Sequence, residues 1–264
     1  MSEKLCIYCG KIVCGSNKSF EHAIPRWLLD YLQVKNQQMY LSNVSRQNES
    51  VRDQTQTPNT LGRNICRSCN NNWLSQIDKS CISDVKHVAK HGTWVSGPLF
   101  EGSYERKLAF STFVYKICLN FFSTSKFSKN YARYYKHFFE HKHAIEGTVF
   151  FLSSYATPSP LNLSHSNNWM IDRTTHREFF AEGGHSPHDM FKFFVQFQNV
   201  AIVVANTGAS RLNVVYDPSV VRPTFMIGAD ELIERQTPLL PSASIHQDNP
   251  ITRVLESISA QTQA

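Results

Sequence analysis

Two short stretches decide how this chain folds, Cys6-Ile7-Tyr8-Cys9 and Cys66-Arg67-Ser68-Cys69. A Cys-x-x-Cys pair offers two thiolates to one metal ion, and a tetrahedral zinc site needs four such ligands. The chain has seven cysteines, an odd number, and it is too long for a small disulfide-stabilised domain. The pairs therefore predict a structural Zn²⁺ site in which an insert of 56 residues separates the two knuckles. The alternative is two unrelated pairs of buried cysteines.

The residues around the two pairs predict short elements. Residues 1–15 are typical of a β-ribbon that turns at Cys9-Gly10, and residues 19–32 favour a helix opening near Pro25. The polar residues 41–60 indicate an irregular loop or a weak hairpin. The three asparagines at 70–72 suit a helix N-cap, and the apolar spacing after them predicts a helix that continues through Val88.

The rest of the chain predicts a mixed α+β domain. Apolar residues near the 3.6-residue period predict a core helix over 104–122, and a second helix is expected over 130–141. Strands are expected at 148–152, 191–198, 200–205 and 212–216, and a short helix near 252–258. We therefore expect an α+β protein with a zinc-stapled module at 1–92, an accessory α+β domain at 93–240, and a flexible or partly helical tail at 241–264.

Composition and charge exclude some classes of protein. Hydrophobic residues make up 41% of the chain, enough for a folded core, and no apolar run is long enough to span a bilayer. No apolar export segment follows Met1, so we expect a cytoplasmic protein without a membrane partner. Residues 1–92 carry twelve Lys and Arg against seven Asp and Glu, whereas residues 143–264 carry seven against eleven. This polarity favours a polyanionic partner for the first half.

The two cysteine pairs enclose a further pattern, Glu21-His22-Ala23-Ile24-Pro25-Arg26-Trp27-Leu28-Leu29, and the second pair continues as Asn70-Asn71-Asn72-Trp73-Leu74. Together, over about residues 5–80, these motifs resemble the HNH (ββα-metal) endonuclease family, in the branch that has a four-cysteine structural zinc. The resemblance implies an N-terminal ββα-metal nuclease module that hydrolyses phosphodiester bonds of DNA.

The resemblance also implies roles for individual residues. His22 matches the general base that deprotonates the attacking water, a step suited to imidazole near neutral pH. Glu21 matches the acidic ligand of a catalytic divalent ion, although Asp is more usual there, and Asn70 matches the last motif position as a second oxygen ligand. Such oxygen ligands suit Mg²⁺ or Mn²⁺. Asn64 is preferred over Asn59 as the middle Asn, which holds the His-bearing loop through backbone hydrogen bonds.

Other polar residues are assigned weaker or structural roles. Asp78 lies eight residues along the helix from Asn70, roughly 12 Å of rise, too far to share its ion.

Residues 104–142 interleave twelve aromatic with eight basic side chains, which indicates either a nucleic-acid surface or, as we favour, a core helix pair with basic residues outside. A cluster of His137, His141 and His143 is interpreted as an exposed polar face. Candidate contacts to nucleic acid are Arg26, Arg67, Arg133 and Lys136.

The sequence thus predicts an endonuclease, and family association favours a role in bacterial defence against phage. Because each chain has one His22 site, cleavage of both DNA strands favours a homodimer. A regulatory protein partner would restrain the activity of the enzyme. Two alternatives stay open. One is a zinc-stapled module that binds nucleic acid or protein without catalysis, and the other is an effector whose activity lies in residues 93–264.

Overall fold

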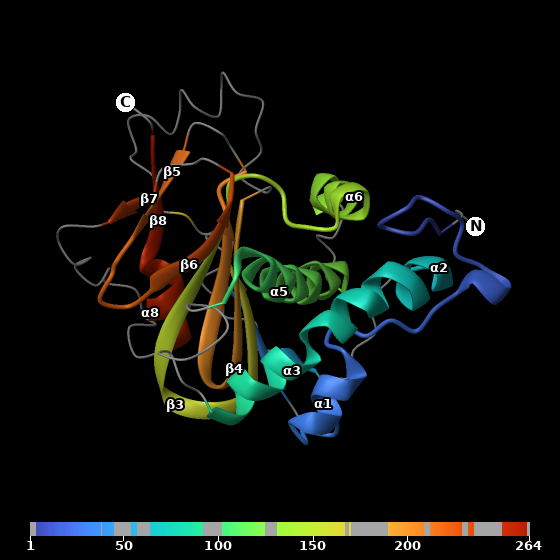
Figure 1. The fold of residues 1–264 in the computed structure, drawn as a ribbon, viewed down its shortest axis with the longest axis horizontal. Helices are drawn as coiled ribbons and strands as arrows, with labels where there is room; N and C mark the ends of the chain where they lie inside the picture. The colour runs from blue at the N-terminus through green and yellow to red at the C-terminus, as the bar shows by residue number, and fades with distance from the viewer. Residues whose placement is uncertain are drawn as a thin grey trace. The chain divides into compact units, whose positions relative to one another are not determined.

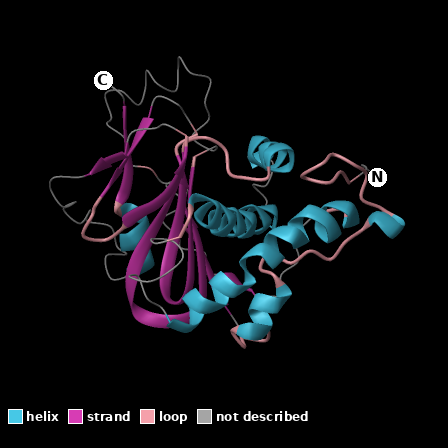
Figure 2. Ribbon diagram, viewed as in Figure 1, coloured by secondary structure: helices cyan, strands magenta, loops and turns pink. Residues whose placement is uncertain are grey.

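The computed structural model describes residues 4–37, 39–44, 54–56, 64–91, 102–124, 131–166, 169, 190–208, 212–228, 232–234 and 250–262. The chain divides into two compact units, Met1–Met39 with Thr55–Ile145, and Tyr40–Gln54 with Glu146–Ala264. The first is built mainly from helices and the second mainly from strands (Figure 1, Figure 2). The predicted domain boundary near residue 92 falls on residues 92–101, outside the described residues, and stays a prediction, and residues 241–249 of the predicted tail also lie outside them.

The first unit opens with an antiparallel ribbon that carries the first cysteine pair. Leu5 forms a β-bridge with Ile12, and the amide of Cys6 donates to the carbonyl of Lys11 at 2.8 Å. Gly10 turns the chain with a φ of +71°, a conformation that side chains with a Cβ seldom adopt. The predicted ribbon is confirmed, and a 3₁₀ turn, η1 (Gly15–Asn17), follows it.

The helix expected near Pro25 is α1 (Arg26–Tyr31). Pro25 occupies its N-cap position, where a missing amide costs no helical hydrogen bond. Leu28 and Leu29 are fully buried and anchor α1 in the core of the first unit.

One continuous helical segment carries the second cysteine pair. It consists of α2 (Arg67–Cys69), a π-helical turn η2 (Asn70–Leu74) and α3 (Ser75–His91). The predicted cap at Asn70–Asn72 is wrong, because the helix begins earlier, with Cys66 as its N-cap. The Cys66 Sγ accepts the amide of Cys69 at 3.4 Å, the task that a polar N-cap side chain performs in other helices. The predicted asparagines form the π turn instead, and such turns often mark functional sites.

Two further helices complete the first unit, α5 (Tyr104–Thr124) and α6 (Ala132–His141). Every residue of α5 from Phe110 to Ser123 is buried, which confirms the core helix that the apolar period predicts. Arg106 of α5 donates through Nε and Nη2 to the two carboxylate oxygens of Asp84 in α3, and this bidentate pair joins the two helices.

The second unit contains two sheets. In the larger one the strand order is β2-β1-β3-β4, with β6 paired to β3 as well. The long strands β3 (Thr148–Ser166) and β4 (Phe191–Asn206) run antiparallel, β1 (Met39–Val44) runs parallel to the end of β3, and β6 (Arg222–Ile227) pairs antiparallel with its start. The remaining strand is β2 (Gln54–Gln56). The predicted strands at 191–198 and 200–205 are one strand, in which Gln198 takes a φ of +53° between them.

The smaller sheet has the order β7-β5-β8 and includes the end of the described chain. Its strands are β5 (Leu212–Tyr216), β7 (Leu232–Glu234) and β8 (Ile258–Thr262). The helix expected near residues 252–258 is α8 (Pro250–Glu256), whereas the sequence did not predict β8 after it. Side chains from both sheets and from α8 form one apolar core that includes Phe151, Phe194, Val214 and Leu255.

A buried lysine joins α8 to the larger sheet. The Nζ of Lys192 in β4 donates to the carbonyl of Leu255 at 2.5 Å and to that of Ile258 at 2.8 Å. The Leu255 carbonyl lies in the last turn of α8, at the negative end of its dipole, which favours a cation. Lys192 also lies 5.2 Å from the centre of the Trp169 ring. Burial nevertheless lowers the pKa of Lys192 to about 7, because the charged form is poorly solvated.

No helix within the described parts of the chain combines the length and the apolar character that crossing a membrane requires.

The buried ammonium of Lys192 should impose a pH dependence on stability. Between pH 7 and 10.5, the folded-state and ordinary pKa values, the unfolded chain holds a proton on Lys192 that the folded chain lacks. The contribution of Lys192 to the unfolding free energy should therefore rise with pH through this window. In denaturant unfolding at fixed pH values, Lys192→Met should show a shallower rise than wild type. Arg222→Met, at an exposed position, should keep the wild-type slope of unfolding free energy against pH. The same slope for Lys192→Met as for wild type would contradict the lowered pKa of Lys192.

Candidate metal centre and its polar neighbours

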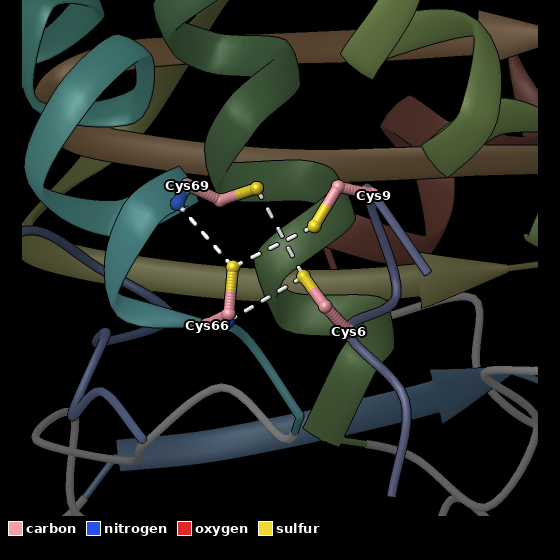
Figure 3. A group of neighbouring side chains, drawn as sticks. All are labelled: Cys6, Cys9, Cys66 and Cys69. Atoms are coloured by element: carbon pink, nitrogen blue, oxygen red, sulfur yellow. Dashed lines mark hydrogen bonds between the residues drawn. The ribbon is translucent and has the colours of Figure 1, made fainter. Parts of the chain in front are cut away.

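The four cysteines of the two pairs converge in the first unit. Their Sγ atoms all lie within 4.8 Å of one another, and Figure 3 shows the side chains pointing toward a common centre from the ribbon and from the start of the helical segment. Cys6, Cys66 and Cys69 are buried and Cys9 is half buried. Within the described parts of the chain, no other group of three or more His, Cys, Asp or Glu side chains brings its ligand atoms together in this way.

The spacing of the sulfur atoms fits zinc. With Zn–S bonds of about 2.3 Å, the edge of a tetrahedral four-thiolate site is about 3.8 Å long. The Sγ atoms of Cys6 and Cys69 are 3.9 Å apart, and those of Cys9 and Cys66 are 3.6 Å apart. A disulfide would need about 2.05 Å, and all four cysteines are free. The four donors therefore suit a closed structural site, in which no coordination position is left for a substrate.

Packing four thiols together changes their acidity. The hydrogen bond between the Sγ atoms of Cys6 and Cys69, 3.9 Å apart, lowers the pKa of Cys6 to about 4 and raises that of Cys69. Burial raises the pKa of Cys66. A divalent cation bound by the cluster favours four thiolates. Metal binding must therefore release protons, and acid must compete with it.

Backbone hydrogen bonds hold the second knuckle against two parts of the N-terminal segment. The amide of Ile7 donates to the carbonyl of Asn64 at 2.9 Å, and the amide of Cys66 donates to the Sγ of Cys6 at 3.4 Å. Lys18 forms a β-bridge with Cys66. The hydroxyl of Ser19 donates to the carbonyl of Ile65 at 2.7 Å. The segment that leads into Glu21-His22 therefore lies beside the segment that leads into the helix of Asn70.

Asn64 has a backbone role in this arrangement. Its φ of +55° lies in the left-handed region, which Asn tolerates better than most residues, and its side chain is exposed. Its carbonyl accepts a hydrogen bond from the first knuckle, at Ile7. The hydrogen bond to the segment that precedes His22 involves its neighbour, Ile65, whose carbonyl accepts from Ser19.

Glu21, the predicted ligand of a catalytic ion, is 8% exposed. Its Oε1 lies 2.9 Å from the Nζ of Lys116 and accepts a hydrogen bond from the Nδ2 of Asn120 at 3.1 Å. Both partners belong to α5. Within the described residues, no interaction is recorded for the second carboxylate oxygen, Oε2.

Lys116 is a buried cation shared by two carboxylates. Its side chain is 1% exposed, and its Nζ lies 2.8 Å from the Oδ2 of Asp78 in α3 as well as 2.9 Å from Glu21. Its Nζ also donates to the carbonyl of Leu74 at 3.3 Å. Burial raises the pKa of Asp78 to about 6, and the Lys116 ammonium opposes this rise. Asp78 therefore forms a buried ion pair with Lys116, and its structural role stays a prediction.

Two uncharged side chains, Tyr8 and Asn120, link Glu21 to the first knuckle through hydrogen bonds. Tyr8, which lies between Cys6 and Cys9 in sequence, donates its hydroxyl to the Oδ1 of Asn120 at 2.6 Å. Asn120 in turn donates to Glu21 and, at 3.3 Å, to the backbone carbonyl of His22. The knuckle, α5 and the Glu21-His22 dipeptide are thereby connected by direct contacts.

His22 and Asn70 keep their side chains available. Both are half buried, and no hydrogen bond or ion pair of either side chain is recorded within the described parts of the chain. The Asn70 amide donates to the carbonyl of Cys66, so the backbone of Asn70 is fixed to the knuckle. An available imidazole and an available amide are the states that a general base and an oxygen ligand require.

The four basic residues proposed as nucleic-acid contacts differ in environment. Arg26, Arg67 and Lys136 are exposed. Among the residues that the structure describes, the ion pairs of Arg26 and Lys136 are long, 3.9 Å with Asp30 and 4.0 Å with Glu140. Arg133 is half buried, its Nη2 donates to the hydroxyl of Tyr134 at 2.7 Å, and its guanidinium lies 4.7 Å from the centre of that ring. Arg133 is therefore engaged in packing within α6.

The three histidines that follow the middle of α6 do cluster. The ring centres of His137 and His141 are 4.3 Å apart, and those of His137 and His143 are 5.5 Å apart. Only His141 is exposed, so the predicted exposed face is partly buried. The Nδ1 of His143 lies 2.8 Å from the carbonyl of Ala144 and is engaged there.

Sequence reasoning missed Lys116, Asn120 and Tyr8. Nothing in the local sequence distinguishes each of these residues, taken singly, from its neighbours in a motif or an apolar helix. Their partners lie 38 to 112 residues away along the chain. One signal was present in the sequence, because Lys116 and Asn120 interrupt the apolar face of α5 four residues apart, on one side of the helix.

Comparisons with protein-family models, curated proteins and solved structures found no match for this chain.

Loss of one cluster thiolate should abolish zinc binding. Cys69→Ser should lower the zinc content of purified protein from about one ion per chain to less than a tenth, because the open site binds far more weakly. Since the metal joins segments 57 residues apart, between Cys9 and Cys66, the variant should also lose helical circular dichroism. The matched control is Cys14→Ser, at an exposed cysteine outside the cluster. Equal zinc content in the two variants would contradict a four-cysteine site.

Two buried tyrosines offer a test of the hydrogen-bond chain. Tyr8→Phe should destabilise the protein by about 1–3 kcal/mol, because Asn120 loses a buried partner. Tyr135→Phe is the matched control, since its ring lies 5.6 Å from that of Tyr8 but its buried hydroxyl has no hydrogen-bond partner within the described residues. It should be neutral or slightly stabilising. Denaturant unfolding measures both, and an equal cost for the two would show that the Tyr8 bond contributes nothing.

Proposed function

We propose that this protein is a divalent-metal-dependent endonuclease of the HNH type, which hydrolyses phosphodiester bonds of DNA. The observation that carries the proposal is the pairing at the second knuckle. Lys18 and Ser19 are bonded to Cys66 and Ile65, so that Glu21-His22 and Asn70 start from adjacent points of the backbone. A four-cysteine zinc ion at this junction would fix the two segments together.

The residues at the junction suit hydrolysis. The imidazole of His22 accepts a proton from the attacking water, because imidazole is the side chain best able to do so near neutral pH. Glu21, through its Oε2, and Asn70, through its amide oxygen, would hold the catalytic ion. When bound, Mg²⁺ or Mn²⁺ stabilises the charge that develops on the phosphate and on the leaving 3′ oxygen. Asn120 takes no direct part in this chemistry. Its Nδ2 donates a hydrogen bond to the backbone carbonyl of His22 and thereby fixes the backbone there.

DNA is the proposed substrate because exposed basic side chains, Arg26 and Arg67 among them, follow the two motifs. Such residues neutralise phosphates. We further propose that the enzyme acts in the cytoplasm in defence against phage, as a homodimer or under the control of a protein partner. One His22 site per chain cuts one strand, so two protomers would cut both.

One observation favours a second function, a zinc-stapled module that binds without catalysis. Glu21 already has a counter-ion, Lys116, at 2.9 Å, and a carboxylate in a buried ion pair has a structural role without any metal. In this alternative the Glu21-His22 dipeptide stabilises the junction of the two cysteine pairs, and the exposed basic residues bind nucleic acid or protein.

Plasmid cleavage separates the two functions. Zinc-loaded wild type should cut plasmid DNA with Mg²⁺ or Mn²⁺ and not with EDTA, and His22→Ala should lower the rate at least a hundredfold, the usual contribution of a general base. The matched control is His91→Ala, at the exposed end of α3, which should cut at the wild-type rate. Zinc content and circular dichroism show whether each variant is folded. Full cleavage by folded His22→Ala would overturn the mechanism, and metal-independent binding without cleavage would favour the alternative.

A further inference from the structure

Two residues of α5 contact the proposed ligand Glu21 from outside the sequence motifs. Lys116 and Asn120 follow the second cysteine pair by about fifty residues, and both reach the same atom, Oε1 of Glu21. We propose that Lys116 and Asn120 are positioning residues, which hold Oε1 so that Oε2 is left to bind the divalent ion. This inference rests on the proposed function, because it concerns the same Glu21.

The contacts are sufficient to fix the carboxylate. An ammonium has three N–H donors, and the structure gives Lys116 three acceptors, Glu21, Asp78 and the carbonyl of Leu74. Lys116 therefore has no freedom to turn away from Glu21. Asn120 is equally constrained, since Tyr8 donates to its oxygen while its nitrogen donates to Glu21. Two fixed donors on one oxygen define the orientation of the whole carboxylate group, including Oε2, which has no partner among the described residues.

The charges are compatible with binding a cation. Glu21 and Asp78 together carry two negative charges and share one ammonium, so the buried group of three has a net charge of −1. A single carboxylate paired with a lysine would be neutral and would attract a divalent ion much less. The second carboxylate, Asp78, thus lets Glu21 be fixed by a cation and still attract another.

The alternative is that Lys116 is only a counter-ion, and it predicts the opposite sign for one measurement. If charge alone matters, removing the Lys116 ammonium takes away a positive charge near the ion and strengthens cation binding. If Lys116 positions Glu21, removing it frees the carboxylate to adopt several rotamers, and cation binding weakens. The direction of the change in affinity therefore separates the two roles.

The experiment measures Mn²⁺ binding to zinc-loaded, full-length protein by electron paramagnetic resonance, which reports free and bound Mn²⁺ separately. Lys116→Met should raise the Kd for Mn²⁺ at least tenfold, and Lys116→Arg should recover most of the wild-type affinity. The matched control is Arg106→Met, which also removes an α5 cation from an α3 aspartate, Asp84, but does not touch Glu21. It should bind Mn²⁺ as wild type does. Equal or tighter binding by folded Lys116→Met would overturn the inference.

A second variant keeps the test decisive if Lys116→Met does not fold. In Tyr8→Phe/Asn120→Leu, both partners of one hydrogen bond are replaced by apolar groups of similar shape, so neither end of that bond is left unsatisfied. No charge is altered, yet Glu21 loses its second donor, so the Kd for Mn²⁺ should rise about threefold or more. Unchanged Mn²⁺ affinity in this variant would equally overturn the inference.

Failure of the proposed function gives a different result. Glu21→Gln in otherwise wild-type protein should abolish Mn²⁺ binding at the site, because an amide oxygen carries no charge. If wild type binds no Mn²⁺, or binds it equally well after Glu21→Gln, then Glu21 is not a ligand and the proposed function fails, with the positioning role that depends on it. If Glu21→Gln abolishes binding while Lys116→Met leaves it intact, only the positioning role fails.

Discussion

The convergence of four cysteine side chains is the interaction on which the first unit depends. A metal ion held by the four cysteines would link the N-terminal ribbon directly to the long helical segment. Backbone contacts around it, such as the bridge between Lys18 and Cys66, are short and would be weak alone. They are nevertheless important because they hold the segment before Glu21-His22 against the segment before Asn70. The cysteine cluster and the placement of the candidate catalytic residues are therefore coupled.

A second constraint acts through charge. Lys116 is placed at the centre of a fully buried helix face, where an ammonium is tolerated only because Glu21, Asp78 and a carbonyl surround it. Buried pairs of this kind add little net stability compared with apolar packing, but they accept few alternative geometries. The same holds for Tyr8 and Asn120, which lie among aromatic side chains and have one arrangement in which all their polar atoms are satisfied. The group gives the dipeptide a defined orientation that an apolar core would not provide.

Local patterns predicted much of this structure. The spacing of two Cys-x-x-Cys pairs predicted the cysteine cluster, and the apolar period over 104–122 predicted α5, because both signals are contained within a few residues. The helix start near Asn70 was wrong because a cysteine, not an asparagine, provides the cap at Cys66. The partners of Glu21 were missed for a different reason. Lys116 and Asn120 interrupt the apolar face of α5, but their partners lie far away along the chain, and sequence spacing does not identify those partners. β8 was missed because its strand pairing with β5 is likewise non-local.

The position of Lys116 also bears on how the chain can be divided. All of the recognisable motifs end before residue 92, which invites cutting there to obtain a minimal fragment. Such a fragment would keep the four cysteines but would leave Glu21 and Asp78 as two unneutralised carboxylates in each other's vicinity. Tyr8 would lose its hydrogen-bond acceptor, and its ring would lose Tyr135 and Phe138 as neighbours. The shortest fragment that folds by itself should therefore contain Lys116, which neutralises the two carboxylates, and the aromatic side chains that pack against Tyr8. Such a fragment extends through α6.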